Sequence, residues 1–251
     1  MQLVEYGADR GETILLLHGG GLSWWNYREA AELLQNDYHV VLPILDGHGG
    51  SDRPFRSIEE NAEEILAYIE EKLGGSVLLI GGLSLGGQIL LELLSRRRDC
   101  CSYALVESAA VIPSRITNAL IGPAFGSSYG LIRNRRFARL QAASLHIKED
   151  LFEDYYRDTC QIALSDMIAF MKANTAYALK ESIRRCQADV RLFIGGKENR
   201  GIKCSAGILQ KHVSKCSLTV FPGSYHGGFS INHAEDYTAA IREAVRKNHF
   251  A

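Results

Sequence analysis

One serine of this chain stands in a setting that could make it a nucleophile. The stretch from Gly82 to Gly86 has the pattern G-x-S-x-G, follows an apolar run and leads into a helix-like segment. Such a pattern between a buried strand and a helix predicts a tight turn that strains the serine backbone and exposes its hydroxyl at the sheet edge. The helix N-terminus would place unpaired N–H groups, Leu85 N–H first, beside any negative charge near Ser84.

A serine hydroxyl is a poor nucleophile until a base takes its proton, so a histidine must come close to Ser84. His226 lies in a glycine-rich loop directly after the last predicted strand. The carboxyl ends of parallel strands share one edge of a sheet, so this loop can reach the turn that holds Ser84. His233 falls at the start of a predicted helix and is the weaker candidate. We therefore predict that His226 is the base.

A carboxylate should fix the histidine tautomer and stabilise the imidazolium that forms. Glu198 follows the predicted strand 190–194, and Glu107 follows the predicted strand 103–106. Both positions fall on the same sheet edge as Ser84. The sequence favours Glu198 as the acid and leaves Glu107 as the alternative.

The negative oxygen of a reacting carbonyl needs two or more N–H donors aimed at it in advance. Leu85 N–H is one candidate, and Gly20 N–H, in the loop after the strand 13–17, is the other. A glycine there lets the backbone approach a substrate without a Cβ in the way. His18 is expected to brace this loop rather than to transfer protons. Trp24 and Trp25 could wall the site or belong to the core.

Apolar runs and helical patterns alternate through the first hundred residues and again near the end. We predict strands at 13–17, 39–43, 77–80, 103–106, 190–194 and 218–221, and helices at 27–35 and 59–73. Continuous apolar strands separated by helices predict a parallel sheet that is covered on both faces.

The pattern changes between residues 113 and 185, where no strand is indicated. Segments 151–160 and 164–177 look helical, and Pro123 and Gly126 are expected to punctuate the start of the region. The predicted organisation is a sheet domain made of residues 1–112 and 186–251, with residues 113–185 inserted as a helical unit.

Composition excludes several classes of partner. The chain has 251 residues, 46% of them hydrophobic and 23% charged, with a net charge of −1. The protein therefore has no net positive charge that would attract nucleic acid or anionic membranes. It has no apolar run long enough to span a bilayer, and its first residues lack the features of a signal peptide. Six cysteines without paired spacing read as reduced thiols. We expect a cytoplasmic protein with no metal and no organic cofactor.

With these residues in place, the chain resembles the α/β-hydrolase superfamily over nearly all its length. The similarity rests on the segments His18–Gly21 and Gly47–Asp52, the Ser84 pentapeptide, Glu198 and His226, in the order serine, acid, histidine. The resemblance implies an α/β fold of the α/β-hydrolase type, with a mostly parallel central sheet flanked by helices. The insertion 113–185 would be its α-helical lid.

The same resemblance implies a role for each site residue. Ser84 would be the nucleophile, His226 the base and Glu198 the acid, while Gly20 and Leu85 would form the oxyanion hole. The family usually has aspartate at the acid position. The longer glutamate side chain must approach the histidine differently, which keeps Glu107 in contention.

The function expected on these grounds is a serine hydrolase that cleaves a small or medium acyl ester through an acyl-enzyme. The same triad could serve thioester or amide hydrolysis, carbon–carbon bond hydrolysis, or a lyase reaction like that of menaquinone synthesis. A small-molecule binding protein on the hydrolase fold is the alternative from a different class. The sequence indicates neither the natural substrate nor a choice between monomer and homodimer.

Overall fold

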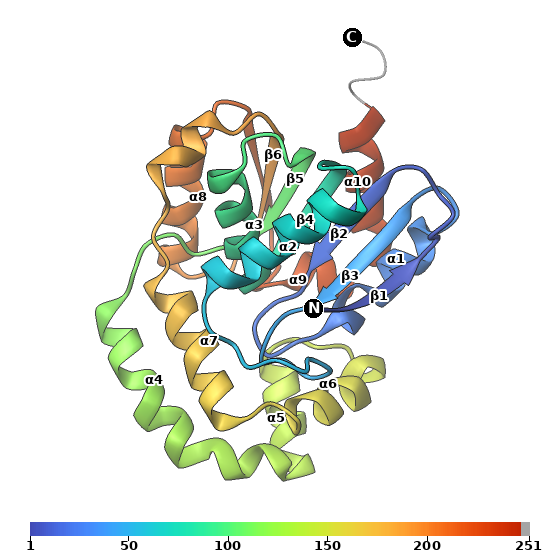
Figure 1. Ribbon diagram of the computed structural model, residues 1–251. Coiled ribbons are helices and arrows are strands. Elements are labelled where there is room, and N and C mark those ends of the chain that lie inside the picture. The colour runs from blue at the N-terminus through green and yellow to red at the C-terminus, as the bar shows by residue number, and fades with distance from the viewer. Residues whose placement is uncertain (247–251) are drawn as a thin grey trace.

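The computed structural model describes residues 1–246 and is built around one seven-stranded sheet (Figure 1). The strand order is β1-β3-β2-β4-β5-β6-β7. The strands are β1 (Gln2–Tyr6), β2 (Thr13–Leu17), β3 (His39–Ile44), β4 (Val77–Leu83), β5 (Cys101–Glu107), β6 (Asp189–Gly195) and β7 (Cys216–Phe221). Only the edge pair β1–β3 is antiparallel, and the other pairs are parallel. The expected mostly parallel sheet is confirmed.

Helices cover both faces of the sheet because its inner strands are apolar on both sides. One face is covered by α2 (Ile58–Lys72), α3 (Leu85–Arg96) and α8 (Arg200–His212), and the other by α1 (Arg28–Leu34), α9 (Gly228–Asn232) and α10 (Ala234–Arg246). In β2, Leu15 and Leu17 belong to the core on the first face, whereas Ile14 and Leu16 belong to the core on the second. The short 3-10 helix η1 (Trp24–Tyr27) leads into α1.

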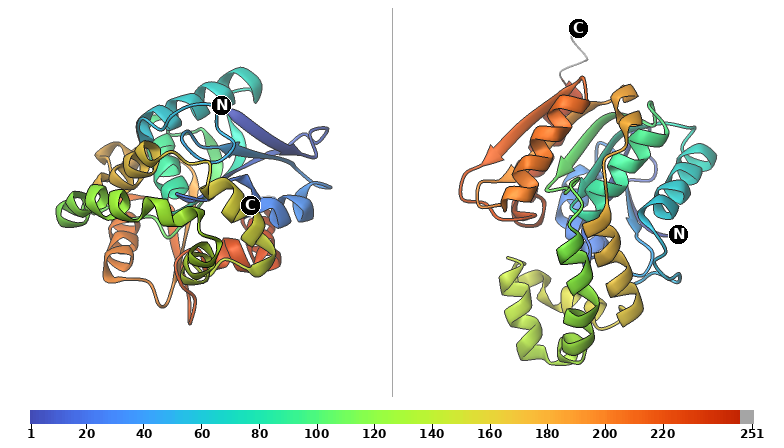
Figure 2. Two further views of the ribbon diagram at one scale, coloured as in Figure 1. Left: turned by 90° about the horizontal axis from the view of Figure 1, so that it is seen from below. Right: turned by 90° about the vertical axis from the view of Figure 1, so that its left-hand side faces the viewer.

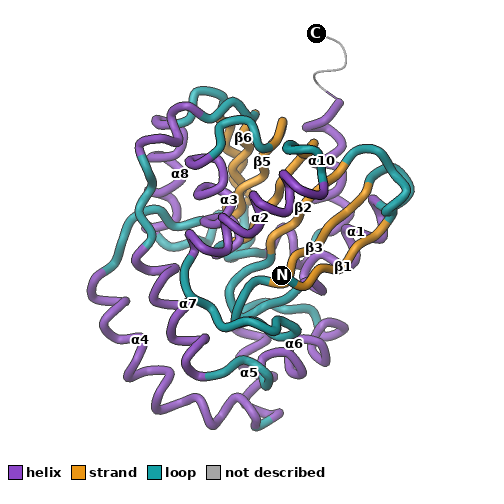
Figure 3. The backbone as a smooth tube through the Cα atoms, in the orientation of Figure 1, coloured by secondary structure: helices purple, strands orange, loops and turns teal. Residues whose placement is uncertain are grey.

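Between β5 and β6 the structure contains helices and no strand, as the sequence predicts. They are α4 (Arg115–Ser128), η2 (Tyr129–Arg133), α5 (Arg135–Ser144), η3 (Glu149–Leu151), α6 (Phe152–Thr159), α7 (Leu164–Ala176) and η4 (Glu181–Arg185). Helices α4 to α7 gather beyond one end of the sheet, in the lower part of Figure 1 and of the right-hand view of Figure 2. Figure 3 shows that this region holds helices and loops, while the strands lie above it. We refer to residues 113–185 as the insertion.

One sequence-based expectation about the insertion is wrong. Pro123 and Gly126 do not end or interrupt a helix, because α4 continues through both of them. A proline inside a helix removes one backbone donor and frees the carbonyl four residues before it. Pro123 and Ala119 are both exposed, so water can bond that carbonyl, and the helix continues.

Side-chain hydrogen bonds join the insertion to the sheet domain. Gln88 of α3 and Asn174 of α7 form a side-chain bond of 2.9 Å. Trp25 Nε1 donates to Asp158 of α6 at 2.9 Å, and Trp25 is buried. These contacts lie at the carboxyl end of the sheet, where β4 and β5 finish.

Candidate active site

Ser84 occupies a strained turn between β4 and α3. Its backbone has φ +52°, a conformation that side-chain-bearing residues rarely adopt, and its N–H donates to Glu107 O at 2.8 Å. A Cβ at Gly86 would lie 2.1 Å from Leu17 O, and one at Gly82 would lie 2.5 Å from Gly86 O. Both glycines are therefore required by the close approach of strand and helix, as the G-x-S-x-G pattern predicts.

His226 is held by Glu198. Its Nδ1 lies 3.1 Å from Glu198 Oε2, and its side chain is 48% exposed while that of Glu198 is 1% exposed. Burial alone would raise the pKa of Glu198, but the hydrogen bond and charge of His226, together with Ser108, lower it below its usual value. An ionised Glu198 can only accept, so His226 Nδ1–H donates to it, and in the neutral imidazole this leaves the lone pair on Nε2.

Ser108, directly after β5, is a third member of this cluster that the sequence reading missed. Its hydroxyl donates to Glu198 Oε1 and lies 3.5 Å from the backbone N of Gly227, next to His226. It is buried and has φ +55°. Ser108 therefore fixes the second carboxylate oxygen of Glu198. Its position at the carboxyl end of a central strand was the signal available in the sequence.

Glu107 lies nearby but is engaged elsewhere. Its carboxylate accepts from Phe229 N at 3.0 Å and from Ser230 N at 3.2 Å, in the first turn of α9. Burial raises the pKa of Glu107, and these hydrogen bonds offset the effect only in part. The structure thus brings Glu198 to the ring of His226 and uses Glu107 to anchor the helix that follows the histidine loop.

The two predicted oxyanion donors lie beside Ser84. Gly20, Ser84 and Leu85 line one cavity, and a Cβ at Gly20 would lie 3.6 Å from the Leu85 side chain. The Gly20 loop is braced by His18, whose Nε2 accepts from Leu45 N at 3.1 Å. Burial, with a smaller contribution from His48, keeps the pKa of His18 well below its usual value, so the ring is neutral.

The cavity at Ser84 has a volume of about 620 Å³ and also includes His226. Much of its wall is apolar and comes from the insertion: Phe125, Leu145, Tyr155, Met167, Phe170 and Met171. This size and lining are typical of sites for small molecules. Trp24 and Trp25 are not among the lining residues. Of the two alternatives that the sequence leaves open, both residues belong to the core, where Trp25 is buried and donates a hydrogen bond to Asp158.

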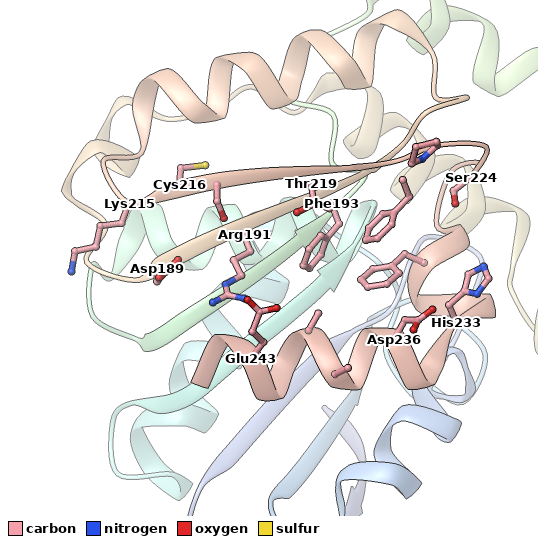
Figure 4. A pocket seen from close by; sticks show the side chains of 16 residues that line it. Asp189, Arg191, Phe193, Lys215, Cys216, Thr219, Ser224, His233, Asp236 and Glu243 are labelled. Carbon is pink, nitrogen blue, oxygen red and sulfur yellow. The ribbon is translucent and has the colours of Figure 1, made fainter. Parts of the chain in front are cut away.

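A larger hollow, of about 950 Å³, lies away from Ser84 (Figure 4). It lies between strands β6 and β7 and helix α10, and its wall includes Asp189, Arg191, Lys215 and Glu243. His233 lies there and does not line the Ser84 cavity. The hollow contains none of the residues proposed for serine chemistry.

Metal-binding clusters and membrane-spanning helices are both absent from the described residues. Within residues 1–246, no group of three or more His, Cys, Asp or Glu side chains is placed to hold a metal ion. No helix in the same range is long and apolar enough to cross a membrane.

Comparison with known proteins agrees with this architecture. Residues 14–241 match the model of the alpha/beta hydrolase family. An AB hydrolase superfamily protein of Gibberella zeae is 31% identical over 137 residues, covering 51% of this chain and 45% of the relative. Lipase 1 of Psychrobacter immobilis is 31% identical over 139 residues, covering 53% and 43%. The chain thus spans less than half the length of these curated relatives.

Among solved structures, an esterase from Exiguobacterium antarcticum superposes with a TM-score of 0.81. It covers 97% of this chain and 94% of the esterase, at 18% sequence identity. A likeness at that identity establishes the shared fold, and the chemistry must be argued from the site itself.

Proposed function

The chain belongs to the alpha/beta hydrolase family, and on that premise we propose that it is a serine hydrolase that cleaves a small or medium acyl ester through an acyl-enzyme. In this proposal Ser84 is the nucleophile, His226 the general base and Glu198 the triad acid. Gly20 N–H and Leu85 N–H form the oxyanion hole. The observation that carries the proposal is the 3.1 Å pairing of His226 Nδ1 with buried Glu198 beside the cavity that holds Ser84.

Acylation follows from these roles. Ser84 Oγ attacks the ester carbonyl carbon while His226 Nε2 takes the hydroxyl proton, and the carbonyl oxygen becomes an oxyanion bonded by the two N–H groups. The bond from the carbonyl carbon to the alcohol oxygen then breaks. His226 gives its proton to that oxygen, so the alcohol leaves neutral and the acyl group remains on Ser84.

Deacylation repeats the steps with water. His226 Nε2 takes a proton from water as its oxygen attacks the acyl carbon, and the bond to Ser84 Oγ breaks. Ser84 recovers its proton from His226, and the acid leaves. Glu198 holds the imidazole in one tautomer throughout and stabilises it when it is charged.

The insertion is proposed to act as a lid and to choose the substrate. Its helices supply most of the apolar wall of the cavity and are bonded to the sheet domain through Gln88 and Trp25. Thioester or amide hydrolysis would use the same steps. Related enzymes that open epoxides or remove halogens use an aspartate nucleophile. Because this chain has a serine at position 84, we do not propose either reaction.

Fluorophosphonate labelling followed by peptide mass spectrometry tests the proposal, because the probe reports an activated serine without a known substrate. We expect an adduct on Ser84 of the native protein. It should be absent in Ser84→Ala and strongly reduced in His226→Ala, and Ser127→Ala, which changes an exposed serine of α4, should label normally. Thermal melts should show that all variants fold. An unlabelled but folded wild-type protein would contradict the serine nucleophile.

A further inference from the structure

The ring of Tyr225, the residue directly before His226, contacts two other side chains. It stacks on the ring of His146, with the ring centroids 3.9 Å apart and the ring planes inclined by 18°. The ammonium group of Lys197 lies 4.5 Å from the centre of the Tyr225 ring and donates to its hydroxyl at 3.2 Å. Because Tyr225 is 41% exposed, these two contacts hold a ring that the core does not enclose.

His146 belongs to the insertion and touches the chain on both sides of His226. Its ring meets Tyr225 on the amino side, and its carbonyl oxygen accepts from Asn232 Nδ2 at 2.9 Å on the carboxyl side. The next residue, Ile147, is buried in the same core as α9. The insertion is therefore anchored against the loop and the helix that flank the proposed base.

The loop that carries His226 is rich in glycine. Three of the seven residues 222–228 are glycines, and Gly223 and Gly227 have φ +83° and +70°. The His226 side chain is itself 48% exposed and is held through its Nδ1 by Glu198. Glycine restricts the backbone less than any other residue, so the position of the His226 ring depends strongly on the contacts that its neighbours make.

The stacked rings lie beside the Ser84 cavity and outside its wall. Leu145 and His226 line that cavity. Their chain neighbours, His146 and Tyr225, are not among its lining residues in the part of the chain that the structure describes. A substrate in the cavity therefore touches neither of the two rings, and an effect of the stack on turnover would act through the position of His226.

We propose that His146 and Tyr225 are positioning residues for the base: their stack holds His226 where its Nε2 can take the proton of Ser84, and it forms only while the insertion lies against the sheet domain. The inference rests on the proposed function of Ser84 and adds a form of regulation. Movement of the insertion would displace the base as well as open the cavity.

Substitutions of the two rings test this role with p-nitrophenyl acetate, whose short acyl group needs little of the cavity wall. His146→Asn removes one ring and suits the left-handed backbone, φ +56°, that this position has. Tyr225→Leu removes the other ring. Each variant should lower kcat about threefold to tenfold and change KM less than about twofold, because a ring stack is a modest contact that no substrate touches.

The double variant and a conservative variant sharpen the test. His146→Asn/Tyr225→Leu should lose no more kcat than the larger single loss, because both changes break the same contact. Tyr225→Phe keeps the ring and should retain kcat within about twofold. Losses that multiply in the double variant, or wild-type kcat in both single variants, would overturn the positioning role while turnover itself still supports the hydrolase.

His233→Asn is the matched control, because it makes the same substitution at an exposed histidine seven residues after the base. The ring of His233 stacks on no aromatic side chain within residues 1–246. The variant should keep wild-type kcat, and thermal melts should show that all variants fold. A loss in His233→Asn equal to that in His146→Asn would also contradict the inference.

Amide hydrogen exchange tests the stack without any reaction. The Gly228 N–H donates to Tyr225 O at 3.1 Å, so a peptide that covers residues 222–228 reports how firmly the loop is held. Exchange in this peptide should be faster in His146→Asn than in the wild-type protein and unchanged in His233→Asn.

A wild-type protein with neither turnover nor fluorophosphonate labelling would count against Ser84 chemistry. Amide exchange then decides the stack separately. Faster exchange in His146→Asn supports the inference that the insertion holds the histidine loop in place, and equal exchange in the variant and the wild-type protein overturns it.

Discussion

The carboxyl edge of the sheet and the insertion position their residues by different means. At the edge, Ser84 is fixed by strained backbone, and a Cβ on neighbouring Gly86 would lie 2.1 Å from a carbonyl oxygen. In the insertion, α4 carries Ile116 and Leu120 at 79% and 60% exposure, and a Cβ on its Gly126 would meet nothing within 4 Å. An added methyl group at Gly86 therefore has no space, whereas one at Gly126 would meet no neighbouring atom.

We therefore expect residues at the carboxyl edge to control the rate of the reaction, and residues of the insertion that line the cavity to control the choice of substrate. The proposed catalytic groups depend on backbone geometry and on buried hydrogen bonds such as that from Ser108 to Glu198. Substitutions there should abolish turnover or unfold the protein. The cavity wall depends on the packing of short helices, and changes to its apolar lining residues, such as Phe125 or Met171, should alter specificity.

The largest effect is expected for the two glutamates. Glu198→Gln should lower kcat by a factor of about 10²–10⁴, because the amide cannot hold the tautomer of His226 that a serine base requires. Glu107→Gln should change kcat less than about tenfold, and should lower the free energy of unfolding by about 1–3 kcal/mol through weaker bonding to α9. Steady-state kinetics and urea denaturation of both variants measure the two effects.

The pair of variants also serves as its own control. If Glu107→Gln alone is catalytically crippled, the acid is assigned to the wrong residue. If both variants keep wild-type kcat, the carboxylates at this edge are structural only.

Gly86→Ala probes the steric limit of the turn. The added methyl would lie 2.1 Å from Leu17 O and 2.6 Å from His18 O, both backbone atoms that cannot turn aside. We expect a loss of at least about 3 kcal/mol in the free energy of unfolding, measured by chemical denaturation. A folded Gly86→Ala variant of wild-type stability would show that strand and helix do not approach as closely as described.

His48 lies where the two regions meet, and it predicts a dependence of stability on pH. Its ring stacks on Phe170 of α7 at a centroid distance of 4.4 Å, and burial lowers its pKa from 6.5 to about 4. Between these values the unfolded chain binds a proton that the folded protein does not. Stability from this residue is thus complete above about pH 6.5 and falls by about 1.4 kcal/mol per unit as the pH drops towards 4.

The variant His48→Gln should remove that contribution and leave the contribution of His18, which is also buried and neutral. Urea denaturation of both proteins between pH 7.5 and pH 5 gives the two slopes. Equal slopes would mean that His48 is protonated in the folded protein or exposed to water.

What the sequence could predict follows the same division. Strands β2 to β7, α2 and the shared edge of Ser84 and His226 could be predicted because apolar runs, helical periodicity and a glycine-framed serine are local patterns. The edge strand β1 was not predicted, because its residues are only partly buried and form no continuous apolar run. The sequence favoured Glu198 over Glu107 but could not exclude Glu107, since both residues lie on that edge and only side-chain geometry separates them. Ser108 is a single serine without a motif.

The residues of the cavity wall could not be predicted from the sequence for a further reason. Which faces of α4 to α7 turn towards Ser84 depends on tertiary packing, and helical periodicity in the sequence does not show it. Pro123 and Gly126 were read as interruptions because both residues disfavour helices, yet exposure to water lets α4 pass through them.

The smallest effect is expected for a substitution in the exposed helix α4. Gly126 lies inside α4, its φ is not in the left-handed region, and a Cβ there would meet no atom within 4 Å. Gly126→Ala should therefore raise the free energy of unfolding by about 0.5–1 kcal/mol, because alanine loses less backbone entropy in a helix. Denaturation of this variant beside Gly86→Ala compares one added methyl in the two regions. A destabilised Gly126→Ala would show that this face of α4 is covered in solution, and that the insertion is packed as tightly as the carboxyl edge of the sheet.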